Sequence, residues 1–227
     1  MKSRALIVGN SDGIGLEATK RLIAAGWDIT GISRSESPLS GPTYKHRVAD
    51  VSDSRYPELM DELVKQGPPD LCIYFAGIGE LLDPLDMSAE ARIIDVNLTG
   101  MVRTAAAVIP QMVKRKQGHF IGVSSLADEL FSAEAPSYHA SKAGLSNYLG
   151  GLALALKPMG VFVTNLRFGF VDTKMAKGDI KPFMMSVEKA VDSVMSCIDK
   201  KPVSYTSPKR IVPLIKFRKF MMKFGAK

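Results

Sequence analysis

The sequence predicts an α/β fold, in which helices cover both faces of a doubly wound, mostly parallel β-sheet. Three observations carry this prediction: strand and helix signals alternate along the chain, the predicted strands are short apolar runs, and closely spaced glycines join the first strand to a helix. Parallel strands need crossover connections, which are usually helices. With 227 residues and 46% hydrophobic content, the chain supports one core, so we expect a single domain over residues 1–207 and a tail over 208–227.

The first β-α-β unit is predicted for residues 5–33. An apolar strand over 5–8 precedes a helix whose apolar residues recur every three or four positions, at Ile14, Ala18 and Leu22. Gly26 ends that helix, and residues 27–33 form the second strand.

Three glycines, Gly9, Gly13 and Gly15, lie between the first strand and its helix. Taken alone they describe a flexible turn, which is common. On a strand-turn-helix, however, glycines allow a tight turn and let a phosphate approach the backbone. Because the helix N-terminus adds free N–H groups and partial positive charge, the loop predicts a dinucleotide-phosphate site.

The remaining elements continue the alternation. Further strands are predicted at 44–53, 68–77, 118–125 and 161–169. Helices are predicted at 54–66, from Ser88 as N-cap to about residue 114, at 136–156 and at 186–197. Ligands bind such sheets at the carboxyl ends of the strands, so polar residues at those ends are the candidates for a site.

Ser125 ends the strand of 118–125, and Tyr138 and Lys142 share one face of the next helix. Alone, a serine at a strand end is commonly a cap, and most such Tyr-Lys pairs lie on the surface. Together they predict a hydride-transfer site. An ammonium about 5 Å from a phenol, at an effective dielectric of about 20, would lower the pKa of the phenol by on the order of two units. Tyr138 would then exchange a proton with a carbonyl or alcohol oxygen held by Ser125.

These and further motifs resemble the short-chain dehydrogenase/reductase family over about residues 4–175. The glycine spacing, "ADVSD" (49–53), "VNLTG" (96–100), the twelve residues between Ser125 and Tyr138, and "FGFVDT" (168–173) are each similar to a family motif. The same spacing selects Ser125 over Ser124. The resemblance implies a Rossmann-type fold and an NAD(P)-dependent oxidoreductase that acts on a carbonyl or alcohol.

The resemblance assigns catalysis to Asn97, Ser125, Tyr138 and Lys142. In this assignment Tyr138 is the general acid or base, Lys142 also binds the nicotinamide ribose, and Asn97 holds a water that links Lys142 to solvent. No metal site is predicted. The glycine loop, the strand ends and the resemblance together imply these cofactor contacts: Gly9, Asn10, Ser11, Gly13, Ile14, Gly15, Ser33, Arg34, Asp50, Val51, Ala76, Gly77, Asn97, Tyr138, Lys142, Gly169, Val171 and Thr173.

Three residues depart from the family pattern. Tyr74 and Phe75 replace two asparagines, and Phe168 replaces a proline. The segment of 174–185, where the family carries a substrate lid, is also short. These departures leave an alternative open, namely a protein that binds NADP(H) in a regulatory or scaffold role with little turnover.

Cofactor choice depends on the end of the second strand. It lacks the acidic residue that would bind the ribose 2′-hydroxyl of NAD. Ser33 and Arg34 suit a 2′-phosphate instead, so NADP(H) is favoured over NAD(H). Against this, Asp12 stands where NADP-preferring members often carry a base, and Arg34 as a solvated loop residue remains an alternative.

A group of apolar residues predicts an apolar substrate pocket, although core packing explains them nearly as well. The group is Phe131, Phe170, Met175, Phe183, Met184 and Met185. In addition, the helix of 136–156 has an apolar, small-residue stretch over 144–156, away from the catalytic face. Because equivalent helices pair across a two-fold axis in the family, we expect a homodimer or homotetramer.

The net charge of +7 is a feature of the C-terminus. Residues 200–227 hold nine Lys or Arg and no acidic residue, while residues 1–199 have a net charge of −2. The nearly neutral body, without zinc-ligand or RNA-binding signatures, argues against nucleic acid as a partner. The N-terminus does not resemble a signal peptide, no apolar run reaches the roughly 20 residues of a membrane span, and there are two cysteines, Cys72 and Cys197. We therefore expect a cytoplasmic protein.

The tail over 208–227 is predicted to form a basic amphipathic helix after Pro213. Such a helix either contacts a membrane surface, making the protein peripheral to it, or packs on the domain with its basic residues in water. Its apolar face would hold Leu214, Phe217, Met221 and Phe224, and its basic face Lys216, Lys219 and Lys223.

Overall fold

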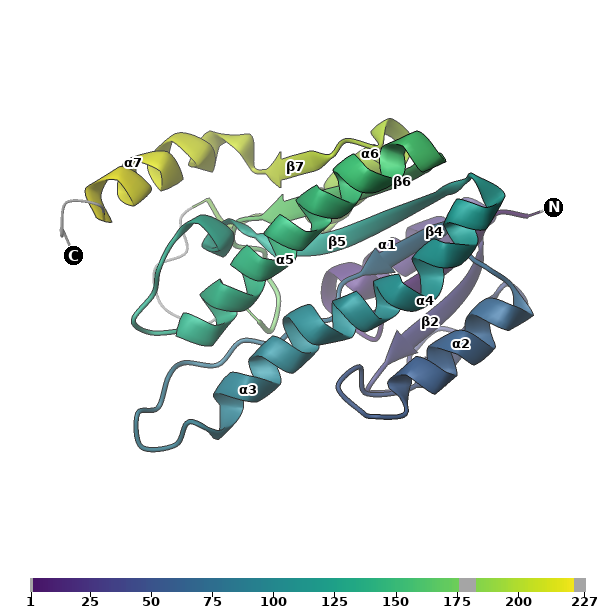
Figure 1. Cartoon of the computed structure of the whole chain (residues 1–227), viewed down its shortest axis with the longest axis horizontal. Coiled ribbons are helices and arrows are strands. Elements are labelled where there is room, and N and C mark those ends of the chain that lie inside the picture. Colours follow the sequence, from purple (N-terminus) through teal and green to yellow (C-terminus); the bar gives the residue numbers. More distant parts are fainter. Residues whose placement is uncertain (1, 176–182, 223–227) are drawn as a thin grey trace.

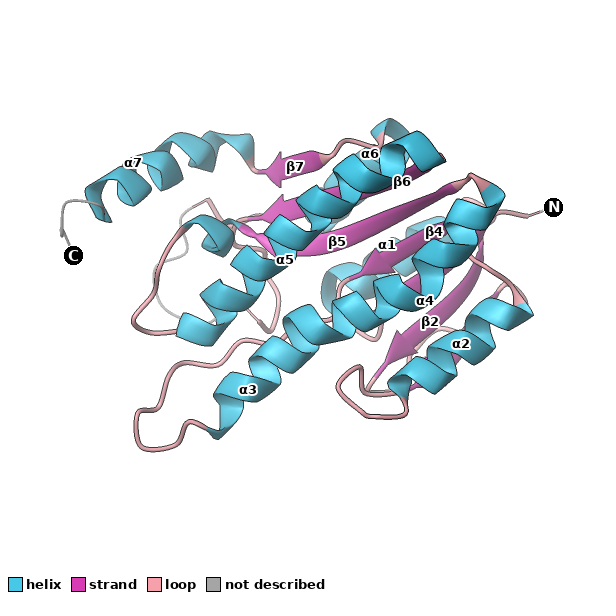
Figure 2. Cartoon of the chain, viewed as in Figure 1, coloured by secondary structure: helices cyan, strands magenta, loops and turns pink. Residues whose placement is uncertain are grey.

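The computed structural model describes residues 2–175 and 183–222, which form a seven-stranded sheet with helices on both faces (Figures 1 and 2). All neighbouring strands are parallel, in the order β3-β2-β1-β4-β5-β6-β7. This Rossmann-like topology confirms the predicted α/β fold. The strands are β1 (Arg4–Val8), β2 (Asp28–Ser33), β3 (Tyr44–Val48), β4 (Leu71–Tyr74), β5 (Gly118–Ser125), β6 (Val161–Phe168) and β7 (Ser204–Ser207).

Each face of the sheet has its own hydrophobic core. Alternate residues of β1 point to opposite faces, so Leu6 belongs to one core and Ile7 to the other. The helices α2 (Tyr56–Gln66), α4 (Gly100–Arg115) and α5 (Pro136–Leu156) cover the first face, and α1 (Gly13–Ala24) and α6 (Val187–Lys200) cover the second (Figure 1). Because both faces are covered, the central strands are almost continuously apolar.

The helix predicted from Ser88 onward differs from the expectation. It divides into α3 (Ser88–Ile94), a π-helical turn η1 (Asp95–Thr99) and α4. Ser88 is the first helical residue rather than the N-cap, because the carboxylate of Asp86 accepts its backbone N–H at 3.0 Å. The π-helical turn has no simple sequence signal, and it lies where Asn97 turns toward the core.

Strand β7 was not predicted. Its sequence, Ser-Tyr-Thr-Ser, is short and polar, and it forms the edge of the sheet beside β6. Edge strands carry weaker apolar patterns because one side stays open to solvent. The strands expected at 44–53 and 68–77 also exist but are shorter, since β3 ends at Val48 and β4 at Tyr74.

By length and composition, the combined helix Ser88–Arg115 is apolar enough to cross a membrane. Half of its most apolar window is buried in the protein, and Met101, Val108 and Met112 have no exposed surface. These side chains pack on the first face of the sheet. We therefore interpret this helix as a core helix.

The tail forms a helix, as expected. Helix α7 (Val212–Met222) follows β7 through the short 3₁₀ turn η4 (Lys209–Ile211) and extends beyond the carboxyl end of the sheet (Figure 1). The predicted Lys223 and Phe224 lie outside the described residues.

Candidate active site

A cavity of about 1490 Å³ opens at the carboxyl ends of the strands. Most small-molecule sites measure roughly 300–1,000 Å³, so this cavity has room for a dinucleotide together with a substrate. Every predicted catalytic and cofactor residue lines it except Asn10 and Asn97.

The loop between β1 and α1 takes its shape from glycines. Gly9 has a φ of +86°, and a Cβ there would lie 2.5 Å from the backbone nitrogen of Ala76. A Cβ on Gly15 would overlap the carbonyl oxygen of Gly9. No side chain caps the start of α1, and its first turn carries no acidic residue. The N–H groups there are available to a pyrophosphate, so this loop fits a dinucleotide.

The side chain of Asn10 packs beneath the glycine loop, against β2 and β3. Its side chain is buried and donates a hydrogen bond to the Tyr44 hydroxyl at 2.7 Å. A Cβ on Gly31 of β2 would overlap the Asn10 amide, so that glycine makes the space for it. The side chain of Asn10 therefore anchors the loop to β2 and β3 rather than facing the cavity.

Ser33 and Arg34 lie at the end of β2, on the wall of the cavity where Asp50 also lies. Arg34 is exposed, and its charge acts on the carboxyl of Asp50. Partial burial acts to raise the pKa of Asp50, but hydrogen bonds from Ser52 and the charges of Arg34 and Arg92 outweigh it and lower that pKa. An ionised Asp50 beside a guanidinium gives this end of the cavity both an acceptor and a cation.

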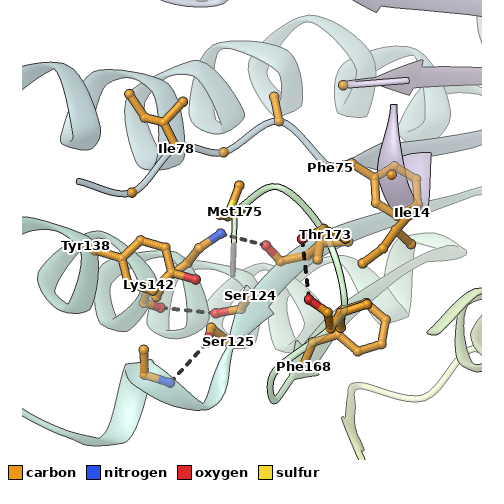
Figure 3. Close-up of a pocket in the computed structure, with 18 of the residues that line it drawn as sticks. Ile14, Phe75, Ile78, Ser124, Ser125, Tyr138, Lys142, Phe168, Thr173 and Met175 are labelled. Carbon is orange, nitrogen blue, oxygen red and sulfur yellow. Dashed lines mark hydrogen bonds between the residues drawn. The ribbon is translucent and has the colours of Figure 1, made fainter. Parts of the chain in front are cut away.

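Tyr138, Lys142 and Ser125 meet in the same cavity, with the Tyr138 ring above the end of β5 (Figure 3). Tyr138 and Lys142 are carried by α5, and Ser125 is the last residue of β5. The Lys142 Nζ atom lies 5.8 Å from the centre of the Tyr138 ring and donates a hydrogen bond to the Val123 carbonyl at 3.0 Å. The Ser125 hydroxyl accepts the backbone N–H of Ala127 at 3.2 Å, which holds it at the start of the next turn.

The pKa of Tyr138 departs from the expectation. Burial raises it, and this effect outweighs the hydrogen bond with Ser125, which lowers it. Burial likewise lowers the pKa of Lys142 to about 8. The predicted lowering of the Tyr138 pKa by Lys142 is therefore wrong for this structure, because desolvation dominates both groups and Lys142 is directed to the Val123 carbonyl.

Asn97 lies behind the cavity wall rather than in it. Its Nδ2 atom donates to the Ile78 carbonyl at 2.9 Å and to the Ser141 hydroxyl at 3.0 Å, and its Oδ1 atom accepts the Ile78 N–H at 2.8 Å. Ser141 in turn donates to the Tyr138 carbonyl at 2.7 Å. Asn97 therefore joins the loop after β4 to the helix that carries Tyr138 and Lys142.

The three departures from the family pattern have clear places in the structure. Tyr74 is fully buried, and its hydroxyl donates to the Val96 carbonyl of η1 at 2.6 Å. A Cβ on Gly100 would lie 2.6 Å from that hydroxyl, so Gly100 makes the space for Tyr74. Phe75 and Phe168 both line the cavity (Figure 3).

The apolar substrate-end residues are only partly as predicted. Phe170 and Met175 line the cavity, but Phe131, Phe183 and Met184 do not. Met185 is 7% exposed and packs in the core of the second face, and its backbone pairs with the segment around Val171. For Met185, core packing is the correct explanation.

The tail forms one side of the cavity, which no pattern in the sequence predicted. Leu126 and Leu130 line the cavity from η2 (Leu126–Glu129) and its end, and the tail closes it with Ile211, Leu214, Ile215 and Arg218. No signal in the sequence brings residue 215 beside residue 126.

A buried ion-pair network lies directly behind Ser125. Arg167 donates two hydrogen bonds to Asp128, at 2.7 and 2.6 Å, and a third to Glu129 at 2.5 Å. The side chain of Asp128 is 4% exposed and also accepts a hydrogen bond from Ser146 of α5 at 2.5 Å. The network therefore ties the turn after Ser125 to β6 and to the catalytic helix.

Comparison with known proteins defines the class of this protein. A family model described as short chain dehydrogenase matches residues 3–182. An uncharacterized oxidoreductase of Myxococcus xanthus is 34% identical over 203 residues, which are 83% of this chain and 80% of that protein. The 3-oxoacyl-(acyl-carrier-protein) reductase of Vibrio cholerae is 30% identical over 186 residues, covering 76% of this chain and 75% of that enzyme.

Solved structures show the same fold. A short-chain dehydrogenase from Streptomyces avermitilis superposes with a TM-score of 0.84 at 20% identity, covering 99% of this chain and 95% of the other. One from Sphingobium yanoikuyae, solved in complex with NADPH, has a TM-score of 0.81 at 23% identity and covers 97% and 95%.

The chain belongs to the short-chain dehydrogenase/reductase family. It is an NAD(P)-dependent oxidoreductase of that family.

Proposed function

We propose that the protein is an NADP(H)-preferring oxidoreductase that interconverts a carbonyl compound and its alcohol, with Tyr138 as general acid and base. One observation carries the proposal: Tyr138, Lys142 and Ser125 face the same cavity as the glycine loop of β1. A substrate carbonyl beside Ser125 would therefore lie within reach of both a proton donor and a bound nicotinamide.

When bound, the nicotinamide supplies the hydride for reduction or accepts it in oxidation. The chain supplies the proton and the orientation. In reduction, the Tyr138 hydroxyl gives its proton to the carbonyl oxygen as the carbonyl carbon gains the hydride, and the Ser125 hydroxyl holds that oxygen in place. In oxidation the Tyr138 phenolate takes the proton back from the alcohol.

Lys142 is suited to exchange a proton next to Tyr138. Because burial lowers its pKa to about 8, it gains and loses a proton close to neutral pH. Its Nζ atom is held by the Val123 carbonyl, so it is pre-positioned near the Tyr138 ring. In this proposal, Asn97 and Ser141 orient α5 and so keep both groups in register.

The NADP(H) preference rests on Ser33 and Arg34. The negative charge of Asp12 would disfavour a 2′-phosphate. The Asp12 carboxylate lies 3.6 Å from the Lys174 Nζ atom, so this charge is partly balanced. The structural relative from Sphingobium yanoikuyae was solved with NADPH, which is consistent with this choice. Ser33 is followed by Arg34 and Ser35, not by the acidic residue that would bind the ribose 2′-hydroxyl of NAD.

The substrate is proposed to be a small, apolar carbonyl or alcohol compound. Leu126, Leu130, Ile211, Leu214 and Ile215 give one side of the cavity an apolar lining, beside the charged Arg218. The relative from Vibrio cholerae is a 3-oxoacyl-(acyl-carrier-protein) reductase, so its substrate also carries a carbonyl group.

The active protein is proposed to be a cytoplasmic homodimer or homotetramer. Both cysteines, Cys72 and Cys197, are free and buried, as suits a reducing compartment. On α5, Gly150 and Gly151 face open space and Leu154 is 77% exposed, which offers a close-packing surface to a second copy. Nucleic acid is not proposed as a partner.

The test is NADPH oxidation with a panel of ketones, aldehydes and quinones. Tyr138→Phe should lower turnover by roughly 10²–10⁴-fold while NADPH binding persists. Tyr148→Phe is the matched control, because Tyr148 lies on the same helix outside the cavity and should retain activity. Turnover that survives Tyr138→Phe undiminished refutes the mechanism. Tight NADPH binding without oxidation across the panel would instead favour the regulatory or scaffold alternative.

A further inference from the structure

Helix α7 has two faces with different surroundings. Toward the domain, Ile215 and Arg218 line the cavity, and the Lys219 Nζ atom lies 3.2 Å from Glu129 of η2. Residues of an α-helix turn by about 100° each, so Phe217 lies on the side opposite Ile215. Phe217 is 62% exposed and Met221 is 38% exposed. Leu214, on the flank of the helix, also lines the cavity, and beside it Phe217 and Met221 leave an apolar strip of α7 exposed to solvent.

The exposed apolar side is bordered by positive charge. Lys209, Arg210 and Lys216 are exposed in or just before α7, and residues 200–227 contain no acidic residue. Single exposed hydrophobic residues are ordinary, but aromatic and long apolar side chains on one helical side beside basic residues indicate an interfacial helix.

Charge decides what covers this surface. The domain already occupies the opposite side of α7, through the cavity wall and Glu129. A second copy packed isologously on α7 would bring its basic residues against those of the first copy. An anionic lipid surface accepts the apolar side chains and neutralises the basic ones at the same time.

We propose that α7 docks the protein on an anionic lipid surface and thereby places the mouth of the cavity at that surface. Phe217 and Met221 enter the interfacial layer, while Lys209, Arg210 and Lys216 contact the headgroups. The same helix lines the cavity through Ile215 and Arg218, so docking and access to the cavity share one element. As a consequence that rests on the proposed function, the substrate is a carbonyl or alcohol dissolved in the lipid.

The experiment is co-sedimentation of the full chain with vesicles of phosphatidylcholine mixed with phosphatidylserine, compared with pure phosphatidylcholine. We expect pelleting with the mixed vesicles and much less with the neutral ones. Raising the salt from about 0.1 M to about 1 M shortens the Debye length from roughly 10 to 3 Å and should release the protein.

Two variants separate the apolar and electrostatic contributions. Phe217→Ser combined with Met221→Ser should lower the vesicle partition coefficient at least about tenfold, since each side chain loses burial in the interface. Lys209→Glu combined with Lys216→Glu should lower it about 30-fold or more, because each basic residue near the surface contributes a factor of about five. Phe162→Ser is the control: Phe162 is 37% exposed at the start of β6, at the opposite end of the sheet, and this change should leave partition unchanged.

Unchanged melting temperatures would show that the α7 variants fold. Equal pelleting on neutral and anionic vesicles, no pelleting at all, or equal losses in the Phe162 control would overturn the docking proposal. So would a drop in molecular mass in the Phe217 and Met221 variant, because a second copy would then cover the helix. Sedimentation requires no turnover, so an inactive protein that still pellets refutes only the proposed function, and an active one that never pellets refutes only the docking.

Discussion

Replacing Arg167 by methionine should destabilise the protein strongly, because among the described residues it leaves the buried Asp128 carboxylate with Ser146 as its remaining hydrogen-bond donor. The Arg167 and Asp128 side chains are 15% and 4% exposed, so solvent cannot replace the lost guanidinium. Breaking a buried ion pair by removing one partner costs roughly 3–5 kcal/mol. For a domain of this size each kcal/mol lowers the melting temperature by about 2–4 °C, which gives a fall of roughly 6–20 °C.

The assay is thermal unfolding of Arg167→Met, of Asp128→Asn and of the double variant. Removing the buried charge in the double variant should restore more than half of the lost stability, since the penalty lies in the unpaired carboxylate and not in the missing guanidinium. Arg55→Met is the matched control. Arg55 pairs with Asp53 at 3.3 Å, but its side chain is 82% exposed, so the melting temperature should hardly change.

The same variants have a functional readout. The charge of Asp128 raises the pKa of Tyr138, and Arg167 balances that charge. Without Arg167 the Tyr138 pKa should rise further, so alcohol oxidation, which needs the phenolate, should require a higher pH. In the double variant the pH dependence of alcohol oxidation should return toward that of the wild-type protein. An unchanged melting temperature in Arg167→Met, or a double variant as unstable as the single one, would refute this reasoning.

Two further predictions concern the cofactor and the assembly. Arg34→Ala should weaken NADPH binding by roughly 10–150-fold and NADH binding far less, because it removes a charge-assisted contact to the 2′-phosphate. Fluorescence titration measures both affinities, with Lys45→Ala as the control, and equal losses for the two cofactors would defeat the NADP assignment. Leu154→Glu should shift the protein toward monomer in light scattering at tens of micromolar, whereas Leu85→Glu, at a loop position that is 97% exposed, should not. A wild-type protein that is already monomeric would rule out the proposed dimer.

The order of strands and helices could be predicted from the sequence because it depends on local patterns. The strand β5 and the helix α5 lie at the predicted residues, since apolar runs, a proline at position 136 and a change of period mark them within a few residues. Strand β7 and the turn η1 lack such marks. The first is short and polar at a sheet edge, and the second inserts one extra residue per turn into an otherwise regular helix.

The site was predictable to the extent that each residue is positioned by its own element. Ser125 ends a strand and Tyr138 and Lys142 share a helix face, the family resemblance selects this combination, and all three residues line one cavity. The sides of that cavity depend on contacts between distant segments. Ile215 and Leu126 line the same cavity because β7 and η4 return the chain to the carboxyl end of the sheet.

The pKa values of Tyr138 and Lys142 could not be predicted from their sequence motif. From spacing alone, a lysine four residues after a tyrosine should lower the pKa of the phenol. In the folded chain, burial acts on both groups in the direction that neutralises them, raising the pKa of Tyr138 and lowering that of Lys142 to about 8. The charge of Asp128 also raises both pKa values. Its partner Arg167 is 39 residues further along the chain, so the proton affinity at this site depends on a contact that forms only when β6 packs beside β5.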